Sequence, residues 1–250
     1  MPLLEVRNLS KSYGVNGKKI IALQNISFTL ETREFLSIVG PSGCGKSTLL
    51  RILMGLEEAT EGEIIYKNKK INEANPKFAM VFQSPSLFPW LTVQENVEIV
   101  LEPLGIEPEE REAIAKKYLS IVGLDGFENA YPKELSGGMK QRVGLARALA
   151  VDPEILLMDE PFSSLDSLTA DALREEVLLL WSDPSIPPDS VILVTHNIDE
   201  AVLMSDRIII LSSRPGRIID NHKVNLPRPR NKKDPEFYNE VDYVISTLSK

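Results

Sequence analysis

The segment that most constrains this chain is a glycine-rich run of nine residues: Gly40, Pro41, Ser42, Gly43, Cys44, Gly45, Lys46, Ser47 and Thr48. An apolar run at 35–39 precedes it and residues 46–54 follow at helical spacing, which predicts a strand, a loop and a helix in that order. Glycines let the loop backbone curl until several N–H groups face one point, and the helix adds its positive N-terminal end. Such a loop cradles phosphate groups. The alternative is a glycine-rich turn that binds nothing, and the strand and helix on the required sides disfavour it.

Two side chains of this loop carry chemistry. Lys46 supplies a mobile cation for the β- and γ-phosphates of a nucleotide, and Ser47 offers a hydroxyl group to Mg²⁺. Cys44 is the single cysteine of the chain, so no internal disulfide can form, and we expect it to contribute only its backbone. The sequence therefore predicts that this loop binds the β- and γ-phosphates of a nucleotide together with Mg²⁺.

A pair of acids follows another apolar run, at 155–158. Asp159 and Glu160 are thus expected at the carboxyl end of a strand, where open α/β sheets bind their ligands. There Asp159 would hold Mg²⁺, and Glu160 would polarise a water aimed at the γ-phosphate. A solvated strand end is the alternative, and the phosphate loop elsewhere in the chain favours the functional interpretation.

Two further polar residues also end apolar runs. His196 follows the run at 191–195 and would stabilise charge on the γ-phosphate, the alternative being a structural histidine. Gln83 follows the run at 78–82 and would contact both Mg²⁺ and the attacking water, because an amide can donate and accept. His222, in the C-terminal segment, is interpreted as structural.

The order of the runs predicts an α/β core interrupted by helices. The inserted helical part is expected at about 84–150, within a main domain taken to span 1–226. Residues 227–250 are expected to form a basic C-terminal tail, loosely ordered at 228–233, with a terminal helix. A solvated run is favoured for this tail over contact with a membrane protein or anionic lipid.

The charge balance excludes some classes of protein. The chain has 250 residues, with 28 basic and 36 acidic side chains and a net charge of −8, which disfavours binding to nucleic acid. No apolar run approaches the roughly 20 residues of a membrane-spanning helix, and the N-terminus lacks the pattern of a signal peptide. A cytoplasmic protein is expected.

The segment 135–141 adds a second phosphate-binding feature. It contains Ser136, Gly137 and Gly138 just before a helical run, so little side chain covers that helix N-terminus. This segment resembles the signature motif of ABC ATPases. Further pieces match in the family order over residues 3–226: Walker A at 40–48, the Q-loop at Gln83, the Walker B pair Asp159 and Glu160, the D-loop at 163–166 and the switch histidine at His196.

The resemblance implies a fold and a dimer. The fold is a P-loop NTPase core with a mostly parallel sheet, an N-terminal antiparallel β subdomain and an inserted α-helical subdomain. In the family, the signature of one subunit caps the ATP on the P-loop of the other, so a second copy of the chain is expected to bind head to tail, with Asp166 near the contact. Tyr13 falls where the family stacks an aromatic ring on adenine, although a core or surface aromatic is the alternative.

The resemblance also implies transport. In transporters, the segment after Gln83 receives a coupling helix of the membrane subunit, and Phe88, Trp90 and Leu91 would give it an apolar landing site. The alternative is that these three side chains pack the insert against the core. The segments at 84–93, 213–218 and 226–230 are most like importer ATPases for nitrate, alkylsulfonates, taurine and bicarbonate. The implied partners are transmembrane permease subunits and, indirectly, a solute-binding protein, which would hold the chain at the inner face of the cell membrane.

Two rival functions remain open at this level. One is a stand-alone ABC ATPase of DNA repair or translation, which the acidic charge and the absence of sustained heptads disfavour. The other is a nucleotide-dependent switch whose signature segment has lost its role.

Overall fold

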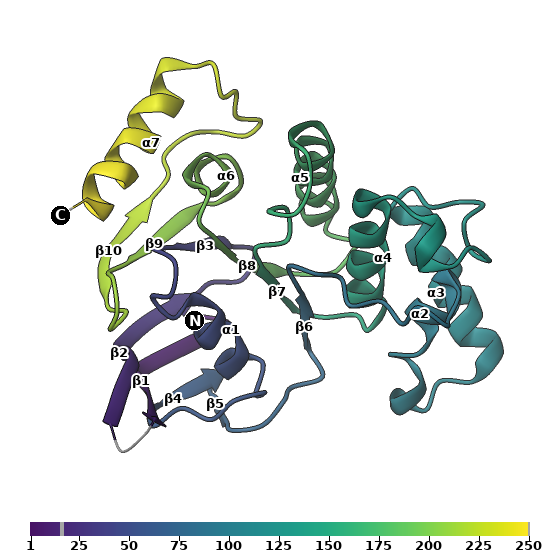
Figure 1. Ribbon diagram of the computed structural model, residues 1–250, viewed down its shortest axis with the longest axis horizontal. Helices are drawn as coiled ribbons and strands as arrows, with labels where there is room; N and C mark the ends of the chain where they lie inside the picture. Colours follow the sequence, from purple (N-terminus) through teal and green to yellow (C-terminus); the bar gives the residue numbers. More distant parts are fainter. Residues whose placement is uncertain (16–17, 250) are drawn as a thin grey trace. The chain divides into compact units, whose positions relative to one another are not determined.

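The computed structural model describes residues 1–15 and 18–249 (Figure 1). Contacts divide the chain into two compact units. The terminal unit combines Met1–Asn75 with Ser190–Lys250, and the middle unit is Pro76–Asp189. No helix among the described residues is long and apolar enough to cross a membrane.

An antiparallel sheet opens the terminal unit. Its strand order is β2-β1-β4-β5, and the strands are β1 (Leu4–Val15), β2 (Lys18–Leu30), β4 (Glu61–Tyr66) and β5 (Lys69–Ile71). Val6 is paired with Phe28 on one side and Ile64 on the other, and all three side chains are buried. The expected N-terminal β subdomain is therefore confirmed.

The second sheet of the terminal unit carries the core. β3 (Phe35–Val39) runs parallel to β8 (Ser190–Thr195) and to β9 (Arg207–Leu211), while β10 (Ile218–Lys223) is antiparallel to β9. Every residue of β3 and β8 is buried, as expected for parallel strands covered on both faces. Two helices of this unit, α1 (Lys46–Leu53) and α6 (Ile198–Met204), follow β3 and β8.

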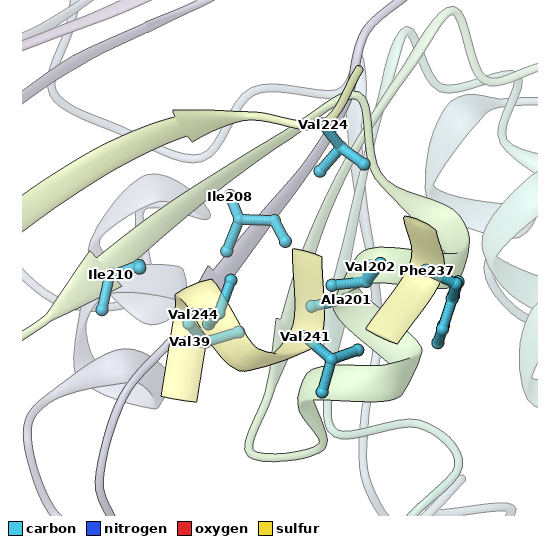
Figure 2. Packing of buried hydrophobic residues seen from close by; sticks show 9 residues of the cluster. All are labelled: Val39, Ala201, Val202, Ile208, Ile210, Val224, Phe237, Val241 and Val244. Atoms are coloured by element: carbon cyan, nitrogen blue, oxygen red, sulfur yellow. The ribbon is translucent and has the colours of Figure 1, made fainter. Parts of the chain in front are cut away.

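The C-terminal helix α7 (Pro235–Leu248) belongs to the same core. Its buried residues Phe237, Val241 and Val244 recur at helical spacing and form one cluster with α6, β3 and β9 (Figure 2). His222 of β10 lies 2.5 Å from a Glu240 carboxylate oxygen, and its ring stacks on Tyr243 at 4.3 Å between centroids. The structural interpretation of His222 is thus supported by its contacts.

The basic tail before α7 is held by the end of α6. Arg230 donates to the carbonyl oxygens of Val202 and Ser205, each at 2.6 Å, and Arg228 donates to that of Met204 at 2.6 Å and pairs with Asp206. The last carbonyls of a helix have no hydrogen-bond donors within the helix, and these two guanidinium groups act as their donors. Burial lowers the pKa of Arg230 to about 10. The expectation of a solvated run is therefore wrong for these two arginines, whose donors are used inside the fold.

We expect Arg230→Ala to destabilise the protein. The variant would leave the Val202 and Ser205 carbonyls without a charged donor, which costs on the order of 2 kcal/mol of unfolding free energy. Lys233→Ala, at an exposed neighbouring position, should change the unfolding free energy by less than about 0.5 kcal/mol. Urea unfolding of both variants measures the difference, and equal midpoints would contradict a clamping role for Arg230.

The middle unit contains a strand pair and most of the helices. β6 (Phe78–Val81) is parallel to β7 (Ile155–Asp159). The four α-helices are α2 (Val93–Glu98), α3 (Pro108–Ile121), α4 (Gly137–Ala150) and α5 (Ser167–Ser182), with short 3₁₀ turns at Glu102–Leu104 and Pro132–Glu134. Thr92 and Glu95 form a capping box at the start of α2. The described elements agree with the expected helical run after Gln83.

Candidate functional site

The glycine-rich loop connects β3 to α1 as expected. Gly43 and Gly45 have φ angles of 75° and 110°, a region that glycine enters without strain. A β-carbon on Gly45 would lie 2.7 Å from Leu23 Cδ2, so close packing also requires glycine there. Lys46 is 5 % exposed and its Nζ donates to the carbonyl oxygens of Gly40 (2.7 Å) and Pro41 (3.1 Å), which places the ammonium group across the loop.

Cys44 lies inside this loop. Its side chain is buried, and burial raises the pKa of the thiol against the opposing effect of the Lys46 charge. A protonated, buried thiol is a poor nucleophile. The geometry therefore assigns Cys44 no chemistry beyond its backbone, whose N–H donates to the Pro41 carbonyl at 3.3 Å.

Tyr13 and His196 share the terminal unit with the loop. The Tyr13 hydroxyl lies 3.5 Å from Thr48 Oγ1, so the ring stands beside the first turn of α1. His196 is exposed and directly follows β8, whose last residue Thr195 is paired with Val39, the last residue of β3. The loop and His196 therefore leave the same edge of the sheet, as the order of parallel strands predicts.

In the middle unit, Gln83 and Glu160 are linked through Ser163. Gln83 Nε2 donates to Ser163 Oγ at 3.1 Å, and Ser163 Oγ donates to the Glu160 carbonyl at 2.9 Å. Glu160 has a φ of 48°, an uncommon conformation for a residue with a β-carbon. Such strain persists where the surroundings fix the backbone, and it clusters at functional sites. Asp159 is the last residue of β7.

The signature segment packs against the start of α5. Ser136 is the N-cap of α4 and accepts from the Met139 N–H at 3.3 Å. A β-carbon on Gly138 would lie 2.4 Å from Thr169 Cγ2, so that position has no room for a side chain. Asp166 caps α5 by accepting from the Thr169 N–H at 3.0 Å, and the hydrogen bond to Thr169 lowers the pKa of Asp166. Thr169 thus connects the signature segment to Asp166.

Each unit therefore gathers its own set of expected residues. The terminal unit brings together Tyr13, the phosphate loop and the sheet edge that carries His196. The middle unit joins Gln83 to Glu160 and the signature segment to Asp166. Sequence reasoning missed Thr169. Because it lies three residues after Asp166, its N–H could have been predicted to donate to that N-cap side chain.

The donor set fits Mg²⁺. Ser47, Gln83 and Asp159 each offer an oxygen, the hard ligand that Mg²⁺ prefers. Within the part of the chain that the structure describes, no group of three or more His, Cys, Asp or Glu side chains could hold a metal by itself. Mg²⁺ that binds together with a nucleotide is held by one or two carboxylates, phosphate oxygens and waters, and Asp159 with two neutral oxygen donors is compatible with that arrangement.

Comparison with known proteins identifies the class. The family model described as "ABC transporter" matches residues 23–163, which is more than half of the chain. The chain is 45 % identical to the aliphatic sulfonates import ATP-binding protein SsuB of Bacillus cereus over 237 residues, covering 94 % of this chain and 91 % of the relative. It is 42 % identical to the nitrate import ATP-binding protein NrtD of Synechocystis sp. over 254 aligned positions, covering 98 % and 94 %.

A solved structure gives the same answer for the fold. The dimeric post-hydrolysis state of the ATP-binding cassette MJ0796, bound to ADP and Pi, superposes with a TM-score of 0.78 at 35 % identity, covering 90 % of this chain and all of that one. The chain belongs to the ATP-binding subunits of the ABC transporter family and is an ATPase. The P-loop NTPase fold expected from the sequence is confirmed.

Proposed function

We propose that this protein is the ATP-hydrolysing subunit of a membrane ABC importer, and that two copies close head to tail around two ATP molecules. One observation carries the dimer: the chain presents two separate helix N-termini suited to phosphate, at Lys46 of α1 and at Ser136–Gly138 of α4. A single γ-phosphate within one chain does not need both of these helix N-termini. The signature segment of each copy then caps the ATP that the other copy holds, as the family motifs imply.

Each predicted site residue has its own role in ATP binding or hydrolysis. Tyr13 stacks on adenine, and Lys46 with the N–H groups of the loop binds the β- and γ-phosphates. Glu160 orients a water for in-line attack, Gln83 contacts that water, and His196 stabilises the charge that develops on the γ-phosphate. Ser47, Gln83 and Asp159 would hold Mg²⁺, which would neutralise charge on the phosphate oxygens. Ser136 and Gly138 from the second copy complete the cradle, with Asp166 at the contact.

An exposed aromatic pair supports a role in transport. Trp90 is 69 % exposed, and its ring lies 5.5 Å from that of Phe88 between centroids, tilted by 53°. Large exposed aromatic side chains mark binding surfaces, and they are enriched where one protein anchors on another. We assign this pair to the coupling helix of a permease, with Leu91 beside it.

The backbone under the aromatic pair is rigidly held. The buried Asn96 side chain accepts from the Phe88 N–H and donates to the carbonyls of Phe88, Leu91 and Thr92. Arg147 of α4 donates to the carbonyls of Pro85 and Ser86. The loop from Gln83 to Thr92 thus presents its rings from a fixed base, and the exposure of Trp90 favours docking over packing of the insert against the core.

The relatives suggest the class of cargo. SsuB and NrtD are named for the import of sulfonates and nitrate, so we propose that the cargo is a small solute of this kind. Taurine and bicarbonate are further candidates. The expected assembly holds two copies of this chain on permease subunits at the inner face of the cell membrane, with a solute-binding protein on the other side. The rival function is a stand-alone ABC ATPase in DNA repair or translation.

An affinity pull-down tests the proposal. Tagged Glu160→Gln protein, captured with ATP and Mg²⁺ from gently solubilised membranes of its native cell, should recover a polytopic permease by mass spectrometry. Adding Trp90→Asp should reduce that recovery at least tenfold, because a charge replaces the apolar anchor. Leu179→Asp, at a position 70 % exposed on α5, is the matched control and should not reduce it.

Two results would count against this function. Recovery of only ribosomal or DNA-repair proteins would leave the ATPase standing and favour the rival. Equal permease recovery with Trp90→Asp and with Leu179→Asp would place the docking site elsewhere on the chain.

A further inference from the structure

The turn after β9 packs directly on the phosphate loop, although about 170 residues separate them in the chain. Gly216 is buried in this turn, and its N–H and C=O bond to Ala22 O and Gln24 N of β2, each at 2.9 Å. A β-carbon on Gly216 would lie 2.2 Å from the carbonyl oxygen of Cys44. The turn therefore touches the phosphate loop backbone to backbone, with no room for a side chain between them.

Arg214 extends this contact to the neighbouring peptide. Its Nε donates to the carbonyl oxygen of Gly43 at 3.3 Å, and its Nη2 would be 3.6 Å from a β-carbon built on Gly43. The peptide bond between Gly43 and Cys44 is planar and trans, so its C=O and its N–H point in opposite directions. A guanidinium group that holds the Gly43 carbonyl thus also sets the direction of the Cys44 N–H.

That N–H takes part in closing the loop on itself. The Cys44 N–H donates to the Pro41 carbonyl at 3.3 Å, the same oxygen that accepts from Lys46 Nζ. A phosphate nest depends on several backbone N–H groups that face one point, and each must keep its peptide plane. Gly43 has a φ of 75° and few steric limits of its own, so the plane of this peptide is restrained by two hydrogen bonds, one from Arg214 to its carbonyl and one from its N–H to Pro41.

A second arginine of the turn has a different partner. Arg217 donates through Nε and Nη2 to Gln24 Oε1 of β2, at 3.1 and 2.6 Å. The turn itself is closed by Ser212, whose Oγ accepts from the Arg217 N–H at 3.0 Å and whose N–H donates to the Arg217 carbonyl at 2.9 Å. Arg217 therefore ties the turn to the antiparallel sheet, and Arg214 ties it to the phosphate loop.

We propose that Arg214 is a positioning residue of the ATP site. It fixes the Gly43–Cys44 peptide in the orientation that phosphate binding requires and adds a positive charge beside the loop. The inference rests on ATP binding by the phosphate loop and does not depend on the identity of the cargo. Its effect falls on nucleotide affinity, because Arg214 holds the backbone of the loop and does not act on the attacking water.

Nucleotide titration of the full-length protein tests this role. A fluorescent N-methylanthraniloyl ATP with Mg²⁺ gives the Kd, and steady-state hydrolysis gives KM and kcat for ATP. Arg214→Ala should raise Kd and KM about fivefold, with kcat within about twofold of wild type. A fivefold change corresponds to roughly half of the free energy that a buried hydrogen bond to a charged group contributes. Arg214→Lys keeps the charge and a donor and should restore more than half of the lost affinity.

Arg217→Ala is the matched control, since it removes an exposed arginine of the same turn that does not reach the phosphate loop. Its Kd should equal that of wild type. An unchanged Kd in Arg214→Ala, or an equal loss of affinity in Arg217→Ala, would overturn the positioning role. Wild-type protein that fails to bind the nucleotide at all would instead contradict the assigned ATP site, so the two failures are distinguishable.

Discussion

Glu160→Gln is expected to bind ATP as tightly as wild type and to hydrolyse it about 10²- to 10⁴-fold more slowly. Glutamine keeps the size of glutamate and its acceptor oxygen but cannot take a proton from water. The backbone at this position is held by the Ser163 hydroxyl, which donates to the Glu160 carbonyl, so the substitution should leave the local geometry intact. A trapped complex with ATP follows, because binding proceeds and the reaction does not.

Size-exclusion chromatography and single-turnover hydrolysis measure the two effects. With ATP and Mg²⁺ the variant should elute as a dimer, and without nucleotide as a monomer. Glu175→Gln, at an exposed position of α5, should behave as wild type. Hydrolysis by Glu160→Gln at a rate near that of wild type would remove Glu160 from the catalytic role.

Mixing two inactive variants should restore activity. Lys46→Ala removes the cation of the phosphate loop, and Ser136→Arg removes the N-cap of α4 and places a positive charge at a helix N-terminus, where it is unfavourable. Each variant alone has two damaged sites per dimer and should lose at least about 10²-fold in ATPase rate. In a mixed dimer, both defects fall in the same composite site, so the other site is intact.

An equimolar mixture is therefore expected to recover a substantial fraction of the wild-type rate, with at most half of the chains in mixed dimers. The rate should depend on the mixing ratio and be greatest near equal amounts. Ser136→Thr, which keeps a hydroxyl cap, is the control and should remain active without a partner variant. No recovery at any ratio, with both variants folded, would contradict shared sites and favour a nucleotide-dependent switch.

The sequence predicted those parts of the molecule whose causes are local. The phosphate loop depends on neighbours in the chain: a buried strand, glycines with positive φ and a helix that begins at Lys46. The strands β7 and β8 are short apolar runs that end at chemically distinctive residues, so the positions of Asp159 and His196 also followed from pattern alone.

Other features depend on partners far along the chain. Arg228 and Arg230 look like part of a solvated basic run, because their acceptors are carbonyls of α6 more than 20 residues earlier. Arg214 is separated from Gly43 by 171 positions, and no local rule connects them. The positive φ of Glu160 is a third case, since a glutamate gives no sign of the backbone conformation that its turn imposes.

The loop from Gln83 to Thr92, which carries Phe88 and Trp90, packs on α4, and this contact has a mechanical consequence. A β-carbon built on Gly144 would lie 3.2 Å from Pro85 Cβ, and Arg147, one turn further along α4, donates to the Pro85 carbonyl. The signature segment lies at the opposite end of this helix. A helix is stiff along its axis, so under the proposed function a displacement of this loop would reach Ser136 with little loss to bending. Under that proposal, α4 would carry the displacement over a fixed length. A permease for a new cargo could be coupled to it without retuning the ATPase, provided that its helix strikes the same two rings.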